Sequence, residues 1–138
     1  MWNNTGDTGV ESLRPYQIEV LPRMDILNYK ASGYIKTEEE FLQFIHDVYV
    51  IINQSGHKKV LADCRSLEGI RPGSLGAIKE VEEAFSPEAI GVRVAVIERE
   101  ENIVTMKHRE YVAYNRGYTL KYFIDPAEAE AWLLKQVA

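Results

Sequence analysis

The stretch Val60–Phe85, VLADCRSLEGIRPGSLGAIKEVEEAF, decides the fold. It predicts a short buried strand that ends at Asp63, a polar turn rich in glycine and arginine, and an amphipathic helix that opens at 72–74. In an α/β sheet, the crevice beyond the carboxyl ends of such strands is where other molecules bind. The residues of this stretch that we expect near a functional surface are Asp63, Cys64, Arg65, Arg71, Gly73 and Ser74.

The pattern on both sides of this stretch predicts one α/β domain. Two extended runs joined by a short polar connection predict a β-hairpin, and Gly33 in its second run suggests a bulge or a close backbone approach. Thr37 and Glu40 have the form of a capping box, which begins a helix that Gly56 ends. The expected strands are Tyr16–Leu21, Ile26–Ile35, Lys59–Asp63, Val92–Ile97 and Tyr118–Ile124. The later helices cover Asn102–Arg116, with Gly117 as its stop, and the residues after Asp125, which is the expected N-terminal cap.

The order of these elements, β-β-α-β-α-β-α-β-α, predicts a three-layer fold. A helix between successive strands calls for a mainly parallel sheet, here of about five strands, and we expect the first strand to pair antiparallel at an edge. No repeat or linker divides the chain, so residues 16–138 are expected to form one domain after a flexible tail over 1–15.

Composition narrows the class of protein. With 46% hydrophobic and 27% charged residues, the chain resembles an ordinary globular protein. The sequence has no apolar run long enough for a membrane span and no signal-peptide pattern, and its single cysteine fits a reducing compartment, so we expect the cytoplasm. The formal charge of −5 argues against nucleic acid as a partner, since phosphate backbones would repel it.

The element order, together with a strand that ends in aspartate and Ile70–Ile78 opening a helix (IRPGSLGAI), resembles the STAS superfamily, the anti-sigma factor antagonist fold. The resemblance covers Tyr16 to Gln136. In that family the corresponding loop reads Ile-Asp-Ser-Ser-Gly-Leu-Gly, and phosphorylation of one serine controls binding to a partner kinase. Here Arg71 stands on the aspartate, Gly73 on the phosphorylated serine and Ser74 on the glycine, so the usual phosphoserine is missing.

The resemblance implies a regulatory or binding domain rather than an enzyme. Its partner would be a protein or a small anionic ligand, bound at the loops after Asp63 and Ile97 and at the start of the second helix. The closing FIDPAEAEAWL at 123–133 resembles a different branch, the SpoIIAA-like or STAS/SEC14-like bacterial proteins. That branch leaves a second hypothesis open, a carrier or sensor of an apolar ligand such as a lipid.

The turn after the predicted strand allows two interpretations. A helix start preceded by glycines, with Arg65 and Arg71 nearby, could hold a phosphate or carboxylate. The stretch matches no nucleotide-binding motif, so we expect no cofactor and favour glycines that shape a turn and arginines that face solvent.

Catalytic and metal-binding interpretations have little support in the sequence. Cys64 would need His57 or His108 nearby to act as a nucleophile, and we favour a small apolar residue at a strand end. Those two histidines and His46 lack metal-ligand spacing. Asp63 is expected to accept backbone N–H bonds rather than to act as a general base.

Two further segments have plain interpretations. Tyr111 and Tyr114 share one face of the third helix, which would suit an interface, including that of a homodimer, although we favour the edge of the core. The segment EREEN at 98–102 is expected to be a solvated loop.

Overall fold

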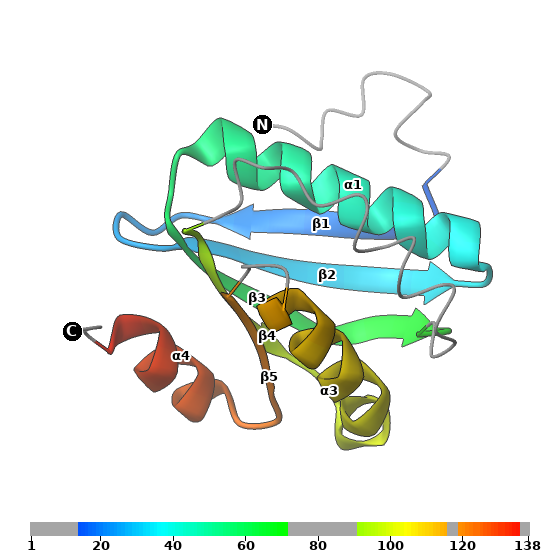
Figure 1. Cartoon of the computed structure of the whole chain (residues 1–138). Coiled ribbons are helices and arrows are strands. Elements are labelled where there is room, and N and C mark those ends of the chain that lie inside the picture. Colours follow the sequence, from blue (N-terminus) through cyan, green and yellow to red (C-terminus); the bar gives the residue numbers. More distant parts are fainter. Residues whose placement is uncertain (1–13, 72–90, 116–118, 136–138) are drawn as a thin grey trace.

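The computed structural model describes residues 14–71, 91–115 and 119–135. Its core is a five-stranded sheet with the strands in chain order, β1-β2-β3-β4-β5 (Figure 1). β1 pairs antiparallel with β2 and forms one edge, and the other neighbours are parallel, which confirms the predicted mainly parallel sheet. The strands are β1 Tyr16–Leu21, β2 Leu27–Ile35, β3 Lys59–Gly69, β4 Arg93–Ile97 and β5 Thr119–Phe123.

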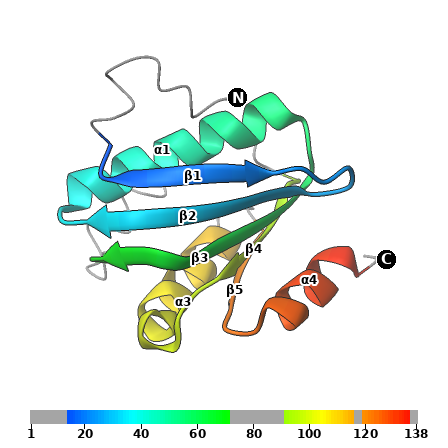
Figure 2. The ribbon, with the colours of Figure 1, turned by 180° about the vertical axis from the view of Figure 1, so that it is seen from behind.

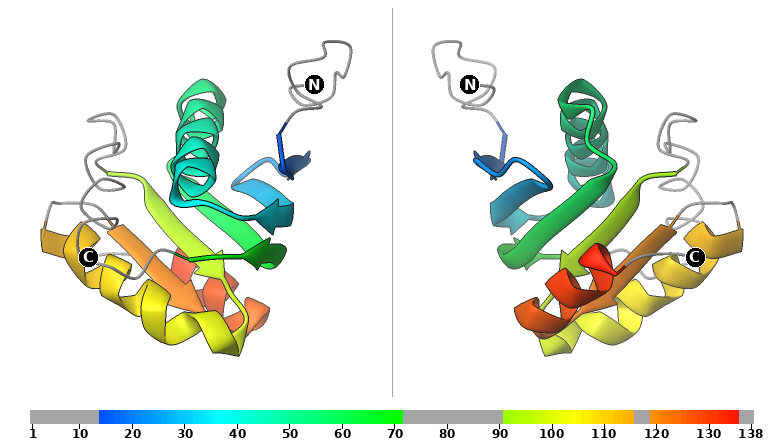
Figure 3. Two further views of the ribbon diagram at one scale, coloured as in Figure 1. Left: turned by 90° about the vertical axis from the view of Figure 1, so that its right-hand side faces the viewer. Right: turned by 90° about the vertical axis from the view of Figure 1, so that its left-hand side faces the viewer.

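Three described helices cover the two faces of the sheet, α1 (Glu38–Ser55), α3 (Glu100–Asn115) and α4 (Pro126–Leu134). Alternate residues of each strand point to opposite faces. Val60 and Ala62 of β3 pack in the core with α1 and α3, whereas Leu61 between them packs in the core with α4. Figure 1 shows α1 and α3 in front of the strands, Figure 2 shows the same elements from behind, and Figure 3 shows them from the two sides. The predicted three layers are confirmed.

Local capping explains where the helices begin and end. The Thr37 hydroxyl accepts the Glu40 N–H at 3.1 Å, and the Glu40 carboxylate accepts the Lys36 N–H at 2.8 Å. Gly56 ends α1 with a φ of 73°, a conformation that glycine adopts without steric cost. In α4 the Asp125 side chain accepts the Ala127 N–H at 3.0 Å. These caps are the ones that the sequence predicts.

Gly33 marks a close approach rather than a bulge. Its φ is 123°, and a Cβ there would lie 2.4 Å from the Pro15 carbonyl oxygen. The irregularity in β2 lies nearby, between Lys30 and Ser32, in the pairing with β3.

β3 is longer than predicted. The prediction that it ends at Asp63 is wrong, because the strand continues to Gly69 in parallel pairing with β2. The parallel pairing of β4 with β3 ends at the pair Asp63 and Ile97. The two strands therefore separate after this pair, and we call the place where they separate the β3–β4 fork.

The irregular pairing within β3 changes which side chains share a face. Beside the step from Lys30 to Ser32 in β2, the register of β3 advances from Asp63 to Ser66. Cys64 and Leu67 consequently lie in the same buried core although they are three positions apart, and both intervening residues are exposed.

The helix predicted to open at 72–74, with Gly73, Ser74 and its end at Phe85, lies outside the described residues, as do the tail up to residue 13 and Gly117.

Candidate functional site

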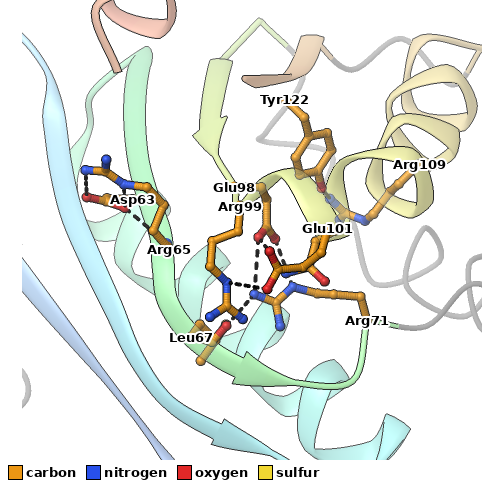
Figure 4. Close-up of polar contacts among 10 residues, drawn as sticks. Asp63, Arg65, Leu67, Arg71, Glu98, Arg99, Glu101, Arg109 and Tyr122 are labelled. Atoms are coloured by element: carbon orange, nitrogen blue, oxygen red, sulfur yellow. Dashed lines mark hydrogen bonds and ion pairs between the residues drawn. The ribbon is translucent and has the colours of Figure 1, made fainter. Parts of the chain in front are cut away.

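A buried ion pair between Arg71 and Glu98 holds the β3–β4 fork together. Arg71 follows the end of β3, and its Nε donates to Glu98 Oε2 at 2.8 Å (Figure 4). Its Nη2 lies 3.4 Å from Glu98 Oε1. Both side chains are only 3% exposed. The pair therefore joins the segment after β3 to the end of β4 across 27 positions of sequence.

The same guanidinium also bonds to the backbone beside the fork. Arg71 Nη2 donates to the Leu67 carbonyl at 2.7 Å, in the part of β3 that has no pairing with β4. Buried carbonyls need a donor, and here a side chain supplies it where the neighbouring strand has ended. Asn102, in the first turn of α3, donates to Glu98 Oε1 at 3.3 Å. One buried cluster thus connects β3, β4 and α3.

This cluster corrects two predictions. Arg71 was expected to face solvent or an anion in an open turn, but it is buried against an internal carboxylate. The segment 98–102 was expected to be a solvated loop, but Glu98 is 2% exposed and α3 begins at Glu100. The sequence signal that could have indicated the pair is a pair of opposite charges within two positions of the ends of two neighbouring parallel strands.

Asp63 and Arg65 form a separate, exposed pair in β3, on the strand rather than in a turn. Arg65 Nη2 lies 2.8 Å from Asp63 Oδ2, and the Arg65 backbone N–H donates to Asp63 Oδ1 at 3.1 Å. The second contact confirms that Asp63 accepts a backbone N–H. Hydrogen bonds from Arg65 hold the pKa of Asp63 below its usual value. Because the Arg65 side chain is 45% exposed, the pair adds little stability and leaves its charges open to other molecules.

Cys64 faces the opposite side of the sheet and is buried. Burial raises the pKa of its thiol, with Glu98 contributing in the same direction. The two histidines considered as its base lie elsewhere. The His57 ring is 3.3 Å from the Met24 carbonyl, before the start of β3, and His108 is exposed on α3. This geometry supports a small core residue.

We expect Cys64 to resist alkylation in the folded protein. A raised thiol pKa keeps the group protonated at pH 8, and burial excludes the reagent. Mass spectrometry after brief iodoacetamide treatment should find little modified protein without denaturant. Modification should be complete in about 6 M guanidinium chloride, which unfolds proteins about twice as strongly per molar as urea does. Rapid alkylation of the folded protein would contradict the assignment.

An apolar cavity of about 60 Å³ lies between the sheet, α1 and α3. Its described lining is mostly aliphatic and aromatic, but it includes the charged side chains Arg71, Glu98 and Arg109. Arg109 of α3 is 4% exposed, and its Nη1 donates to the Tyr122 hydroxyl at 2.9 Å. The cavity therefore has polar groups in an otherwise apolar wall. Sequence reasoning missed Arg109, which sits at a buried position of a helix without a marked apolar stripe.

Tyr111 and Tyr114 are 67% and 77% exposed, so the interpretation that they form the edge of the core is wrong. They line a surface groove of about 450 Å³ between α3, β5 and α4, together with Lys121 and Trp132. The groove is distant in sequence from the fork residues, and only its tyrosines were anticipated.

Within the described ranges, no group of three or more histidine, cysteine or acidic side chains is arranged to hold a metal ion. In those same ranges, no helix is long and apolar enough to cross a membrane.

Comparison with solved structures identifies the fold. An uncharacterised protein of the DUF3478 family from Shewanella loihica PV-4, described as having a SpoIIAA-like fold, aligns over 88% of this chain and 95% of its own, with a TM-score of 0.52 and 22% identity. An anti-sigma factor antagonist from Mycobacterium paratuberculosis aligns over 89% and 97%, with a TM-score of 0.55 and 11% identity. No family model and no curated protein sequence matches the chain. The chain has the SpoIIAA-like α/β fold that the resemblance to the STAS superfamily implied.

Proposed function

We propose that this protein is a non-enzymatic regulatory domain of the STAS type, which binds a partner protein at the β3–β4 fork. The observation that carries the proposal is the fork itself, at the carboxyl end of a parallel pair, where α/β folds place their binding sites. The shared fold of an anti-sigma factor antagonist, a class that acts through protein partners, supports it.

The exposed side chains near the fork suit a protein partner. Arg65, Ser66 and Glu68 are exposed on β3, and Ile70 after the strand is 38% exposed. Glu101 at the start of α3 is also exposed. Charges of both signs beside an apolar side chain are typical of the polar rim of an interface.

The proposed domain acts without the usual phosphoserine. Arg71, at the position of the family's acidic residue, donates hydrogen bonds to the Glu98 carboxylate and to the Leu67 carbonyl. Its charge is opposite to that of the family's residue, and the position of the phosphorylated serine is occupied by Gly73. Partner binding would therefore depend on the fork residues themselves, whether or not Ser74 is modified.

A charge reversal at the fork tests the proposal. Affinity purification from cells of the source organism should enrich a partner with the wild-type protein and lose it with Arg65→Glu, because the exposed guanidinium would lie in the interface. Lys58→Glu is the matched control, since Lys58 is also exposed but precedes the opposite end of the same strand. Identical sets of enriched proteins for all three baits would refute the placement at the fork.

A second candidate function, carriage or sensing of an apolar ligand, is favoured by the cavity between the sheet, α1 and α3. Its volume of about 60 Å³ suits a small ligand rather than the whole acyl chain of a lipid. Native mass spectrometry of protein purified from cells would reveal such a ligand as an added mass, whereas a clean mass of the chain alone would count against this function.

A further inference from the structure

One nitrogen of the buried Arg71 side chain has no hydrogen-bond partner among the residues that the structure describes. Nε and Nη2 are engaged by Glu98 and Leu67, but no described residue accepts a hydrogen bond from the buried Nη1. A buried donor left in this state costs about 1–3 kcal/mol, and more when it carries charge. Such groups are rare in folded proteins and call for an explanation. Arg71 also lines the apolar cavity, so an acceptor there could satisfy it.

The walls of the cavity restrict what this acceptor can be. Besides Arg71, the lining of the cavity includes Ile45 and Val48 of α1, Val96 of β4 and Met106 of α3. An occupant must therefore have one polar end and an apolar remainder. The group to be satisfied is one nitrogen of the Arg71 guanidinium, and a carboxylate oxygen would form a charge-assisted hydrogen bond with it, which favours an anionic polar end.

The volume of the cavity sets the length of the occupant. At about 60 Å³ it is less than half the roughly 150 Å³ of an engineered apolar cavity that holds benzene. Benzene has six carbon atoms, so a molecule with a carboxylate and about two to four carbons in total matches the space.

We propose that the cavity binds a short-chain carboxylate, whose oxygen accepts from Arg71 Nη1 and whose alkyl part packs against Val96 and Met106. This inference rests on the second candidate function, ligand binding in the cavity, and adds to it the chemical class of the ligand. It gives Arg71 two tasks, since the same side chain that holds the fork together would hold the ligand.

Matched acids and alcohols provide the test. ¹⁵N-labelled wild-type protein is titrated with acetate, propionate and butyrate, and with ethanol, propanol and butanol, at one ionic strength. We expect saturable shifts for the acids and binding at least about tenfold weaker for the matched alcohols, because a charge-assisted hydrogen bond contributes more than the 1.4 kcal/mol that corresponds to tenfold. Nuclear Overhauser contacts from the ligand to the Met106 methyl group would place it in the cavity.

Two variants and a control sharpen the result. Arg71→Lys keeps a positive charge opposite Glu98 but removes the forked donor, and should abolish most of the preference for acid. Val96→Ile adds a methylene to the wall and should weaken butyrate more than acetate. Lys58→Arg, at an exposed position just before β3, should change neither. Should Arg71→Lys fail to fold, the comparison of acids with alcohols in the wild type still decides.

The failures of the inference and of the candidate function are distinguishable. Equal binding of acids and alcohols would overturn the carboxylate proposal while supporting a ligand cavity. If neither series binds, the carboxylate proposal falls. In that case a larger ligand seen in native mass spectrometry would preserve the second candidate function, and a clean mass of the chain alone would remove it.

Discussion

Replacement of Glu98 by alanine is expected to lower the free energy of unfolding by about 3–5 kcal/mol. The substitution leaves the Arg71 guanidinium buried without its carboxylate, because both side chains are 3% exposed and solvent cannot replace the lost partner. It also removes the acceptor of the Asn102 side chain. Urea unfolding followed by circular dichroism measures the change, provided that the slope of the unfolding free energy against urea concentration is the same in both proteins.

An exposed glutamate three positions further on provides the control. Glu101 lies 3.4 Å from Arg99, and its side chain is 67% exposed, so Glu101→Ala should cost less than about 1 kcal/mol. The double variant Arg71→Met with Glu98→Met should lose less than the sum of the two single variants, since no buried charge is then left alone. A Glu98→Ala protein as stable as Glu101→Ala would contradict the description of the fork.

Replacement of Asp47 by alanine has the second large effect. Asp47 lies on the buried side of α1 and is 6% exposed. Its carboxylate accepts from the Tyr16 hydroxyl, from Arg14 Nε at 3.0 Å and from Gln43 Nε2 at 3.0 Å. Burial, reinforced by this hydrogen bond, raises the pKa of Tyr16. The carboxylate therefore fastens the edge strand β1 to α1.

Asp47→Ala should lower the free energy of unfolding by about 2–4 kcal/mol, since a buried tyrosine hydroxyl and a partly buried guanidinium lose their acceptor. The better helix propensity of alanine offsets only about 0.5 kcal/mol of this. Asp47→Asn keeps one oxygen acceptor, so its free energy of unfolding should lie between those of the wild type and of Asp47→Ala. Glu39→Ala, in the exposed first turn of the same helix, should stay within about 1 kcal/mol of wild type. Equal stability of the Asp47→Ala and Glu39→Ala proteins would refute this role.

The sequence predicts the elements that local chemistry specifies. The capping residues Thr37 and Asp125 and the terminating Gly56 lie where the structure has them, because each acts on backbone groups within a few positions. The parallel strand over 92–97 and the antiparallel edge were also predicted, since an apolar run between helices and a short hairpin each allow few arrangements.

The features that the sequence did not reveal depend on distant partners. β3 continues beyond Asp63 because β2 still pairs with it there. The irregular register at this point disrupts the alternation of buried and exposed residues by which a strand is recognised in a sequence. Arg71 meets Glu98 across 27 positions. Nothing within a few positions of Asp47 indicates its role, because Tyr16 and Arg14, which make it a buried acceptor, are more than 30 positions away. The candidate site was therefore anticipated in its position at the sheet end but not in its chemistry.

The most direct test of the proposed function maps the surface that the captured partner covers. In the ¹⁵N–¹H spectrum of the labelled protein, addition of that partner should shift or broaden the amides of Arg65 to Ile70 and of Glu98 to Glu101, which flank the β3–β4 fork. The amides of β1 and α4 should change little. Changes concentrated on β1 or α4, with the fork amides unaffected, would contradict the assignment of the fork as the partner site.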